Sequence, residues 1–307
     1  MSHLAPTGRL GRRLGKPLIV VVLCTSLPVS AADQKGWGYL MQKLIGDGVE
    51  RSAVERVFGD RRMERFNSVS FKLDPVESQA LYRSLLAPRS VRDARRCRAR
   101  HDTWFRGAEK RLGVPASVIS AILHVETRCG GYTGNFLVLH RLARLAMANE
   151  PGNVLLNVRE HSKGAGPTVI PEIERKVRER ARYLEDTFYP EVLATFEIGR
   201  RLNIDPLGIR GSKAGAFGFP QFLPSSFLRF AIDGDGDGSV SLYHPADAIA
   251  SAANYLAAHG WSPAISRSEQ RRVIWAYNRS EAYIDTVLGL ADLIERDSTY
   301  VSREPGP

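Results

Sequence analysis

The feature that most constrains the fold is an apolar stretch at 114–131 that carries one carboxylate near its end. Pro115 is typical of the first turn of a helix, and the two glycines that close the stretch are typical of a helix stop. Ile119, Ile122 and Glu126 are spaced i, i+3 and i+7, so they share one helix face. The sequence therefore predicts a buried helix whose apolar face ends in an acid.

The position of Glu126 predicts unusual acidity. The C-terminal end of a helix dipole disfavours negative charge, and burial disfavours it further. Both effects raise the pKa of a glutamate from its reference near ~4.3, to about 6 in glycosidase general acids. A carboxyl group that stays protonated near neutrality can protonate a leaving group. The residues equally allow an ion pair between Glu126 and an arginine, or a side chain that points into solvent.

Apolar periodicity predicts helices along most of the chain and almost no strands, so the fold class is mostly α. The stretch 149–171 is rich in glycine and proline, which predicts a loop or an insertion. The helices are expected at 37–59 in two short pieces, at 92–113 as one long exposed helix, and at 136–147, 172–202, 245–260 and 281–296.

Residues 1–32 have the layout of a secretory signal peptide. Basic residues precede an apolar run at 18–27, and small residues follow it. The run is too short to span a bilayer comfortably. Leu23 stands before Cys24 where a lipoprotein signal usually has a small residue, which argues against lipidation. The sequence thus predicts export to the periplasm and a mature chain with no transmembrane segment.

The charge of the chain favours an anionic partner. Removing residues 1–32 takes away four basic residues and lowers the formal net charge from +10 to +6. No zinc-finger spacing occurs, and no basic helix is interleaved with aromatic residues, so nucleic acid is not expected as a partner. An anionic polymer such as a cell wall fits better.

Export would leave two cysteines, Cys97 and Cys129, in a compartment that permits disulfides. A bridge between them would tether the preceding helix to the Glu126 region. Two buried thiols are the alternative, and the sequence leaves both open.

The segment 211–227 combines glycines and prolines with aromatic residues. Glycine lets backbone approach a ligand closely, and apolar neighbours argue against a solvated loop. This pattern predicts a walled ligand groove with Ser212 and Gln221 as polar guides. A tight structural turn packed by phenylalanines is the alternative. A phosphate-binding loop is excluded, because the required Gly-Lys-Ser/Thr ending is absent.

An acidic loop follows at 233–239, with the start of an EF-hand calcium pattern. Its end departs from the pattern, because His244 stands where a bidentate glutamate is expected. We expect a structural Ca²⁺ or Na⁺ site, or a loop without metal. The candidate metal ligands are Asp233, Asp235, Asp237, Ser239 and Asp247.

Near the C-terminus, Tyr277 and Tyr283 flank a turn that also contains Asn278. Aromatic faces that stack on sugar rings and tyrosines at the edge of the core are both consistent with this spacing.

Taken together, these segments resemble the lytic transglycosylase B family of bacterial cell-wall enzymes. Two regions carry the resemblance, at 114–134 and at 211–294. Its motifs are Val125–Thr127 with Gly130, Gly211–Gly218, Pro220–Ser226, Asp233–Gly238, Pro245–Ile249, Ala253–Tyr255, His259–Trp261, Tyr277–Ser280 and Tyr283.

The resemblance implies a lysozyme-like helical fold, of the goose-type and transglycosylase kind, with an EF-hand-like metal loop. It implies cleavage of the MurNAc-β-1,4-GlcNAc bond of peptidoglycan with formation of 1,6-anhydro-MurNAc, and no catalytic cofactor. Glu126 takes the place of the acid/base. Glycan strands are the implied partner, and cell-wall synthesis enzymes are further candidates. Positions lining the glycan cleft are taken by Ser212, Gln221, Tyr277, Asn278 and Tyr283.

The expected organisation is a signal peptide at 1–32, a helical segment at 33–113 that packs on the catalytic domain, a transglycosylase domain at 114–300 with an insertion near 149–179, and a tail at 301–307. Two rival functions remain. A goose-type lysozyme would use the same acid but hydrolyse with water. A non-catalytic, calcium-dependent wall-binding protein would need no acid.

Overall fold

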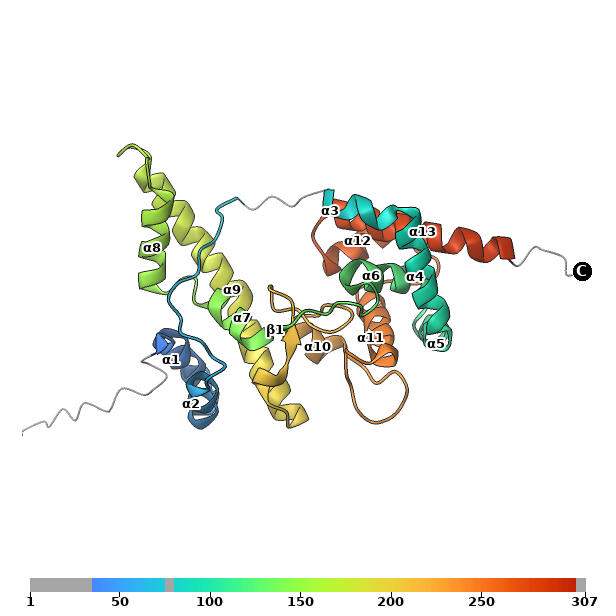
Figure 1. Ribbon diagram of the computed structural model, residues 1–307, viewed down its shortest axis with the longest axis horizontal. Coiled ribbons are helices and arrows are strands. Elements are labelled where there is room, and N and C mark those ends of the chain that lie inside the picture. Colours follow the sequence, from blue (N-terminus) through green and yellow to red (C-terminus); the bar gives the residue numbers. More distant parts are fainter. Residues whose placement is uncertain (1–34, 75–79, 302–307) are drawn as a thin grey trace, which may run out of the picture.

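The computed structural model describes residues 35–74 and 80–301, and the expected signal peptide and tail lie outside these ranges apart from the tail's first residue. Figure 1 shows a helical protein whose helices form two groups. The helices are α1 (Gly38–Gly46), α2 (Arg51–Gly59), α3 (Ala80–Arg83), η2 (Ser84–Leu86), α4 (Pro88–Arg100), α5 (Asp102–Leu112), α6 (Ala116–Thr127), α7 (Val138–Ala146), α8 (Pro151–His161), α9 (Ile170–Leu202), η3 (Pro206–Gly208), α10 (Pro224–Phe230), α11 (Pro245–Ala258), α12 (Arg267–Tyr277) and α13 (Glu281–Val301).

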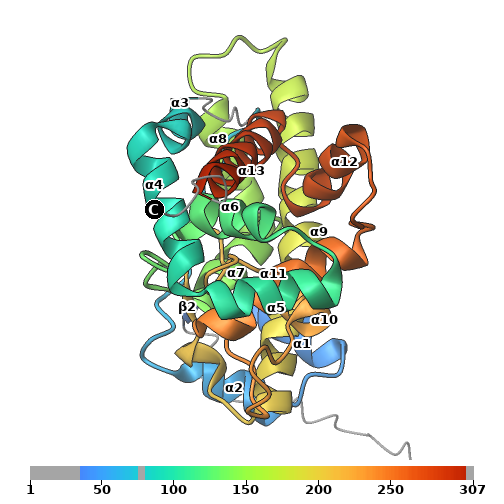
Figure 2. The same cartoon turned by 90° about the vertical axis from the view of Figure 1, so that its right-hand side faces the viewer.

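Helix α6 forms the centre of the first group. It packs against α4, α5, α11 and α13, which surround it in Figure 2. Most of its side chains are buried, as the apolar pattern predicted. It begins at Ala116, with Pro115 as its N-cap residue, and ends at Thr127, because Arg128 adopts a left-handed conformation. The helix therefore ends three positions before Gly130, the first of the two glycines that the sequence marked as its end.

The second group is built on α9, a helix of 33 residues. Helices α7, α8 and α10 pack along it. Helix α1 is tied to α9 by polar contacts, among them an ion pair between Lys43 and Glu185. The long periodic stretch at 172–202 thus forms the predicted helix.

The prediction of a loop over 149–171 is wrong for about half of that stretch, because α8 occupies Pro151–His161. The Glu150 carboxylate accepts hydrogen bonds from the N–H groups of Gly152 and Asn153, which caps the helix. Pro151 takes the first helical position, where its missing N–H costs nothing. Proline and glycine here begin a helix rather than interrupt one.

The prediction of one long exposed helix over 92–113 is also wrong. Helix α4 ends at Arg100, His101 leaves the helical conformation, and α5 begins at Asp102. Phe105 and Ala108 are buried, and α5 packs on α11. The break turns the apolar side of α5 toward the core.

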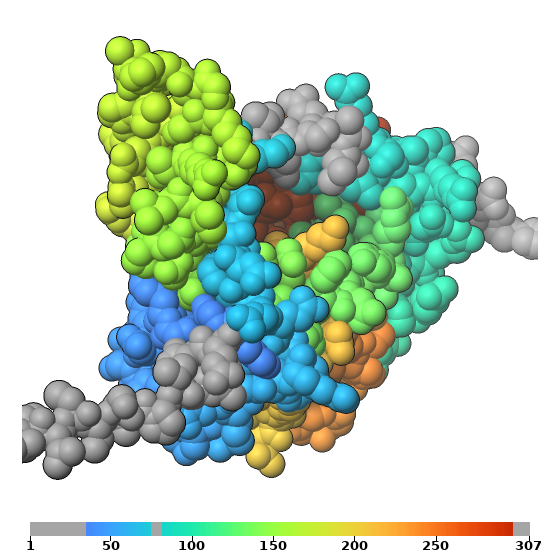
Figure 3. Space-filling model, turned by 60° about the vertical axis from the view of Figure 1, so that its left-hand side comes forward, coloured from blue at the N-terminus to red at the C-terminus, as the bar shows by residue number. Residues whose placement is uncertain are grey.

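Between the two groups lies a short two-stranded sheet. Strand β1 (Phe136–Leu137) pairs antiparallel with β2 (Arg210–Gly211), with Phe136 opposite Gly211. The chain then folds back on itself through single bridges from Phe217 to Gly211 and to Phe222. Figure 3 shows a hollow in the molecular surface between the α8–α9 arm and the α4 region, with the red C-terminal helices at its floor. Across the described ranges, no helix is both long and apolar enough to cross a membrane.

Candidate active site

Glu126 lies in the last turn of α6, half-buried, and its Oε1 accepts one hydrogen bond from the Tyr283 hydroxyl at 2.6 Å. Burial raises the pKa of Glu126 to about 7, and the hydrogen bond from Tyr283 offsets part of that rise. No lysine or arginine among the described residues forms an ion pair with Glu126. The carboxyl group is therefore substantially protonated at neutral pH, as its place on the helix predicted.

Two tyrosines from the C-terminal helices stand beside this acid. The Tyr277 and Tyr283 rings are nearly parallel, with centroids 6.4 Å apart and planes 12° apart. Burial, and after it the neighbouring Glu126, raise the pKa of both phenols, so both remain hydrogen-bond donors. The Tyr277 hydroxyl donates to the Pro220 carbonyl at 2.5 Å. Tyr277 thus joins α12 to the glycine-rich segment, and Tyr283 joins α13 to the acid.

The glycine-rich segment 211–227 is a compact series of turns. Ser212 exchanges hydrogen bonds with Ala216, through its backbone N–H and its hydroxyl oxygen. Gly218 has φ +73° and lies so close to Leu242 that an added Cβ would come within 2.3 Å. Gln221 also has a positive φ, of 50°, and its Nε2 donates to the carbonyls of Thr133 and Gly218. The segment is therefore both tightly turned and packed against its neighbours.

The structure links three of the predicted site residues directly, namely Glu126, Tyr283 and Tyr277. The Tyr283 hydroxyl donates a hydrogen bond to Glu126, and the Tyr277 hydroxyl donates one to the carbonyl of Pro220, the residue before Gln221. Asn278 is half-buried and follows the last residue of α12. Ser212 is half-buried in the turn that leads into the glycine-rich segment, and its hydroxyl supports that turn. No contact of Ser212 or Asn278 with the acid is seen among the described residues.

Thr127 contributes a contact that sequence reasoning did not single out. Its hydroxyl donates to the Phe219 carbonyl at 2.9 Å, and its oxygen accepts from the Gly130 N–H. The residue after the acid is therefore linked to the glycine-rich segment. A polar side chain on the buried side of an apolar helix was the available signal, because such a group needs a partner.

The acidic loop gathers its carboxylates without a lysine or arginine in contact among the described residues. Ligand atoms of Asp233, Asp235 and Asp237 lie within 4.8 Å of one another, and so do those of Asp235, His244 and Asp247. Asp247 is buried and accepts from the N–H groups of Gly234 and Ser241, so it fastens both ends of the loop. Ser239 donates to Asp237. Oxygen atoms clustered in this way match the donor set that a hard cation takes.

Cys97 and Cys129 form a disulfide that links α4 to the turn after α6. Of the two alternatives that the sequence left open, the structure contains the bridge.

Comparison with known proteins agrees with this geometry. Residues 32–270 match the transglycosylase SLT domain family. The chain is 37% identical over 149 residues to membrane-bound lytic murein transglycosylase B of Escherichia coli (strain K12), a match that covers 48% of this chain and 32% of that protein. The chain thus spans about a third of the length of that curated relative.

Two solved structures share the fold. The lytic transglycosylase SLT35 of E. coli, in complex with calcium, is 21% identical, with a TM-score of 0.62 over 88% of this chain and 94% of that one. SltB3 from Pseudomonas aeruginosa, in complex with NAG-anhNAM-pentapeptide, is 21% identical, with a TM-score of 0.61 over 87% of this chain and 80% of that one. The helical fold expected from the resemblance is confirmed, and the chain belongs to the transglycosylase SLT domain family.

Proposed function

We propose that this protein cleaves the MurNAc-β-1,4-GlcNAc bond of peptidoglycan as a lytic transglycosylase, with Glu126 as its single acid and base. The observation that carries the proposal is the half-buried Glu126, whose pKa burial raises to about 7, so that a large share of the carboxyl group is protonated at neutral pH. A retaining hydrolase holds its second carboxylate at roughly 5–5.5 Å, where its charge would act on the pKa of Glu126. None of the described carboxylates does so.

One acid suffices when the nucleophile belongs to the substrate. Glu126 gives its proton to the bridging oxygen, which leaves as the O4 hydroxyl of GlcNAc. The C6 hydroxyl of the same MurNAc then attacks C1, and its proton passes to Glu126. The new C1–O6 bond replaces the broken glycosidic bond, the acid regains its proton, and no water is consumed.

The tyrosines and the glycine-rich segment form the wall of the glycan cleft in this proposal. Tyr283 is buried in the core and orients the Glu126 carboxyl group, and the half-buried Tyr277 ring offers an apolar face to a sugar ring. Ser212, Gln221 and Asn278 supply polar groups along the same path. The complex of SltB3 with NAG-anhNAM-pentapeptide supports this ligand class.

Mass spectrometry of digested muropeptides tests the reaction. We expect products one water lighter than those of a hydrolase, and a rate that falls as pH rises above about 7, because the ionised Glu126 cannot donate. Hydrated products would instead identify a goose-type lysozyme. A Glu126→Gln protein that binds the wall and keeps full lysis would exclude Glu126 as the acid.

We infer that the acidic loop binds a structural calcium ion through Asp233, Asp235 and Asp237, with Asp247 fastening the loop. The oxygen donors of the described residues cluster without a lysine or arginine partner, His244 being the basic side chain beside Asp235, and SLT35 was solved with calcium. Saturating Ca²⁺ should raise the Tm, since a ligand at 100 Kd stabilises by about 2.7 kcal/mol. An Asp235→Asn variant should lose that rise, and an unchanged wild-type Tm would exclude the site.

We also infer export, with residues 1–32 as the leader and action in the periplasm. The relative in E. coli is membrane-bound. The division into a helical segment at 33–113 and a transglycosylase domain at 114–300, with an insertion near 149–179, remains our proposal. Fractionation of cells, followed by mass measurement of the mature N-terminus, tests the leader.

A further inference from the structure

The turn that follows the acid has an uncommon backbone. Arg128, Cys129 and Gly130 have φ values of 50°, 57° and 81°, so three successive residues are left-handed. The first two carry a Cβ, which makes this conformation unfavourable for an L-residue. Such a turn persists only where its surroundings hold it in place. The neighbouring segments that hold this turn therefore fix the position of the C-terminal end of α6.

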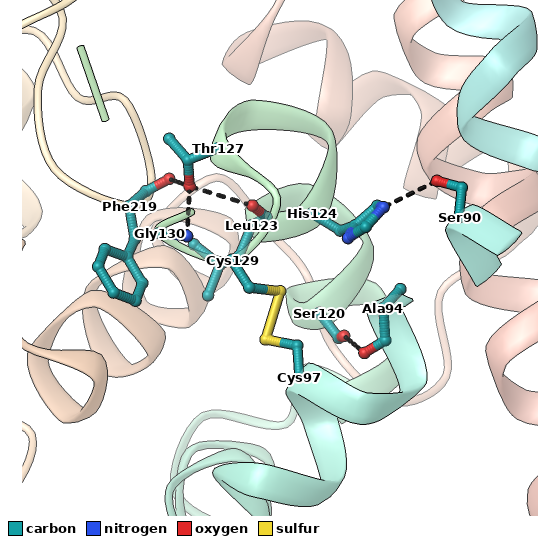
Figure 4. Close-up of a disulfide and its surroundings, with 10 residues drawn as sticks. All are labelled: Ser90, Ala94, Cys97, Ser120, Leu123, His124, Thr127, Cys129, Gly130 and Phe219. Carbon is teal, nitrogen blue, oxygen red and sulfur yellow. Dashed lines mark hydrogen bonds between the residues drawn. A yellow bond between two sulfur atoms is a disulfide. The ribbon is translucent and has the colours of Figure 1, made fainter. Parts of the chain in front are cut away.

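On one side the turn is held by α4. The Cys129 side chain is bonded to Cys97 in the last turns of α4, while the Cys129 N–H donates to the Leu123 carbonyl at 2.9 Å. Figure 4 shows the disulfide between α4 and the turn that follows α6. The middle residue of the turn is thus fixed through both its backbone and its side chain.

On the other side the turn meets the glycine-rich segment. The Thr127 hydroxyl bridges the Gly130 N–H and the Phe219 carbonyl, each at 2.9 Å (Figure 4). The Phe219 ring fills the space beside Gly130, where an added Cβ would come within 2.1 Å of it. Pro220, the next residue, accepts the bond from Tyr277. The place of this wall relative to Glu126 therefore depends on the turn.

We propose that the Cys97–Cys129 disulfide is a positioning element for catalysis, which holds the left-handed turn so that Glu126 and the Phe219–Pro220 wall keep the spacing that the reaction needs. This inference rests on the proposed transglycosylase function. The disulfide-bonded protein is the competent enzyme, and opening the bridge slows the chemical step more than it weakens substrate binding.

Cys97 is buried and Cys129 half-buried, and a reagent can reach the disulfide from the hollow that both residues line. Cys97 and Cys129 line a hollow of about 500 Å³ together with Arg96, Arg100 and Arg128. Neighbouring arginines favour the thiolate that leaves when a disulfide is attacked. Dithiothreitol opens the bridge in two steps: one of its thiolates forms a mixed disulfide, and its second thiol closes the oxidised ring. The protein disulfide is thereby reduced to two thiols. Dithiothreitol supplies the two electrons and is itself oxidised to a cyclic disulfide.

The test compares the full-length mature protein before and after dithiothreitol with a Cys97→Ser/Cys129→Ser double variant, on peptidoglycan. We expect reduction to lower kcat about tenfold with little change in KM, which corresponds to loss of an interaction needed for the chemical step. The basic limb of the pH profile should move to lower pH, because Glu126 gains water as the turn relaxes. Dithiothreitol should not change the double variant further.

Loss of stability must be separated from loss of positioning. Val177→Ala serves as the matched control, because Val177 is fully buried in a small cluster with Val154 and Ala181 on the α8–α9 arm. It should lower the Tm and leave kcat unchanged. Gly130→Ala keeps the disulfide but displaces Phe219, so it should lower kcat as reduction does.

Two results would overturn the inference in distinguishable ways. A reduced protein that forms anhydro products at the original kcat, with the original pH profile and only a lower Tm, makes the disulfide a stabilising bridge alone. An oxidised protein that forms no anhydro products refutes the proposed function, and this inference with it.

Discussion

The half-buried Glu126 and the buried Glu185, one in each group of helices, have opposite surroundings. Glu126 accepts a single hydrogen bond, from Tyr283. Glu185, on α9, is 3% exposed and accepts from the Tyr39 hydroxyl, the Lys43 ammonium and the Asn149 amide. Burial is common to both, so the partners make the difference. A carboxylate with a cation and several donors joins helices together, whereas one with a lone phenol keeps its proton and can donate it.

The largest expected difference between the two glutamates is in their contribution to kcat. Glu126→Gln should lower kcat about 10³-fold, because the amide has no proton to give. The matched Glu185→Gln variant should keep kcat. Rates of anhydro-product formation measure both, together with wall binding as a check that the cleft is intact. An equal fall in kcat in the two variants would show that Glu126 has no special role in catalysis.

The next largest effect is on how the free energy of unfolding depends on pH. The pKa of Glu126 is raised from 4.5 to about 7, so the unfolded chain ionises at lower pH than the folded one. The stability of the wild type should therefore fall as pH rises from 4.5 to 7. Glu126→Gln avoids this loss and should become more stable than the wild type by about 2 kcal/mol at pH 8. Urea denaturation at pH 4 and pH 8 measures it, and a pH-independent difference would contradict the raised pKa.

Glu185→Gln should destabilise the fold by about 1.5 kcal/mol, since it removes the charge that Lys43 and its neighbours were placed to meet. The cost is moderate because the Lys43 side chain is 37% exposed and can be solvated. Chemical denaturation at pH 7 gives the value. A neutral or stabilising result would show that the cluster around Glu185 does not hold α1 on α9.

The smallest expected effect is on the pH–rate profile, and it distinguishes Tyr283, which donates to Glu126, from Tyr39, which donates to Glu185. Tyr283→Phe should lower kcat about fivefold and raise the pKa of Glu126 further, because the lost hydrogen bond favoured the charged form. The basic limb of the pH–rate profile should then move to higher pH. Tyr39→Phe removes the corresponding donor from Glu185 and should leave the profile unchanged. A shift in the opposite direction for Tyr283→Phe would reverse the sign of this argument.

Local sequence pattern predicted several of the helices, but it missed others and did not predict which residues of different helices contact one another. The apolar run before Glu126 predicted α6, and periodicity predicted α9. The helix at Pro151–His161 was missed, because its proline and glycine occupy starting positions that composition alone does not reveal. The bond from Tyr283 to Glu126 joins residues 157 positions apart. No spacing rule relates such residues, so only the family resemblance brought them together in advance.

The disulfide is a second feature that the sequence alone could not decide. Two cysteines 32 positions apart were equally consistent with a bridge and with free thiols. The choice depends on the break at His101, which sets the direction of α4 relative to α6. That break had not been predicted, since the charged stretch reads as one continuous helix.

The attachment of α1 to α9 also bears on how the chain assembles. Tyr39 and Glu185 are 146 positions apart, and Tyr189 reaches back to Asp47 over 142. During synthesis the first helices emerge from the ribosome long before the helix that completes them. Contacts of such long sequence separation slow folding and leave apolar surface uncovered meanwhile. Until α9 has been made, the N-terminal helices lack the partner that covers their inner face.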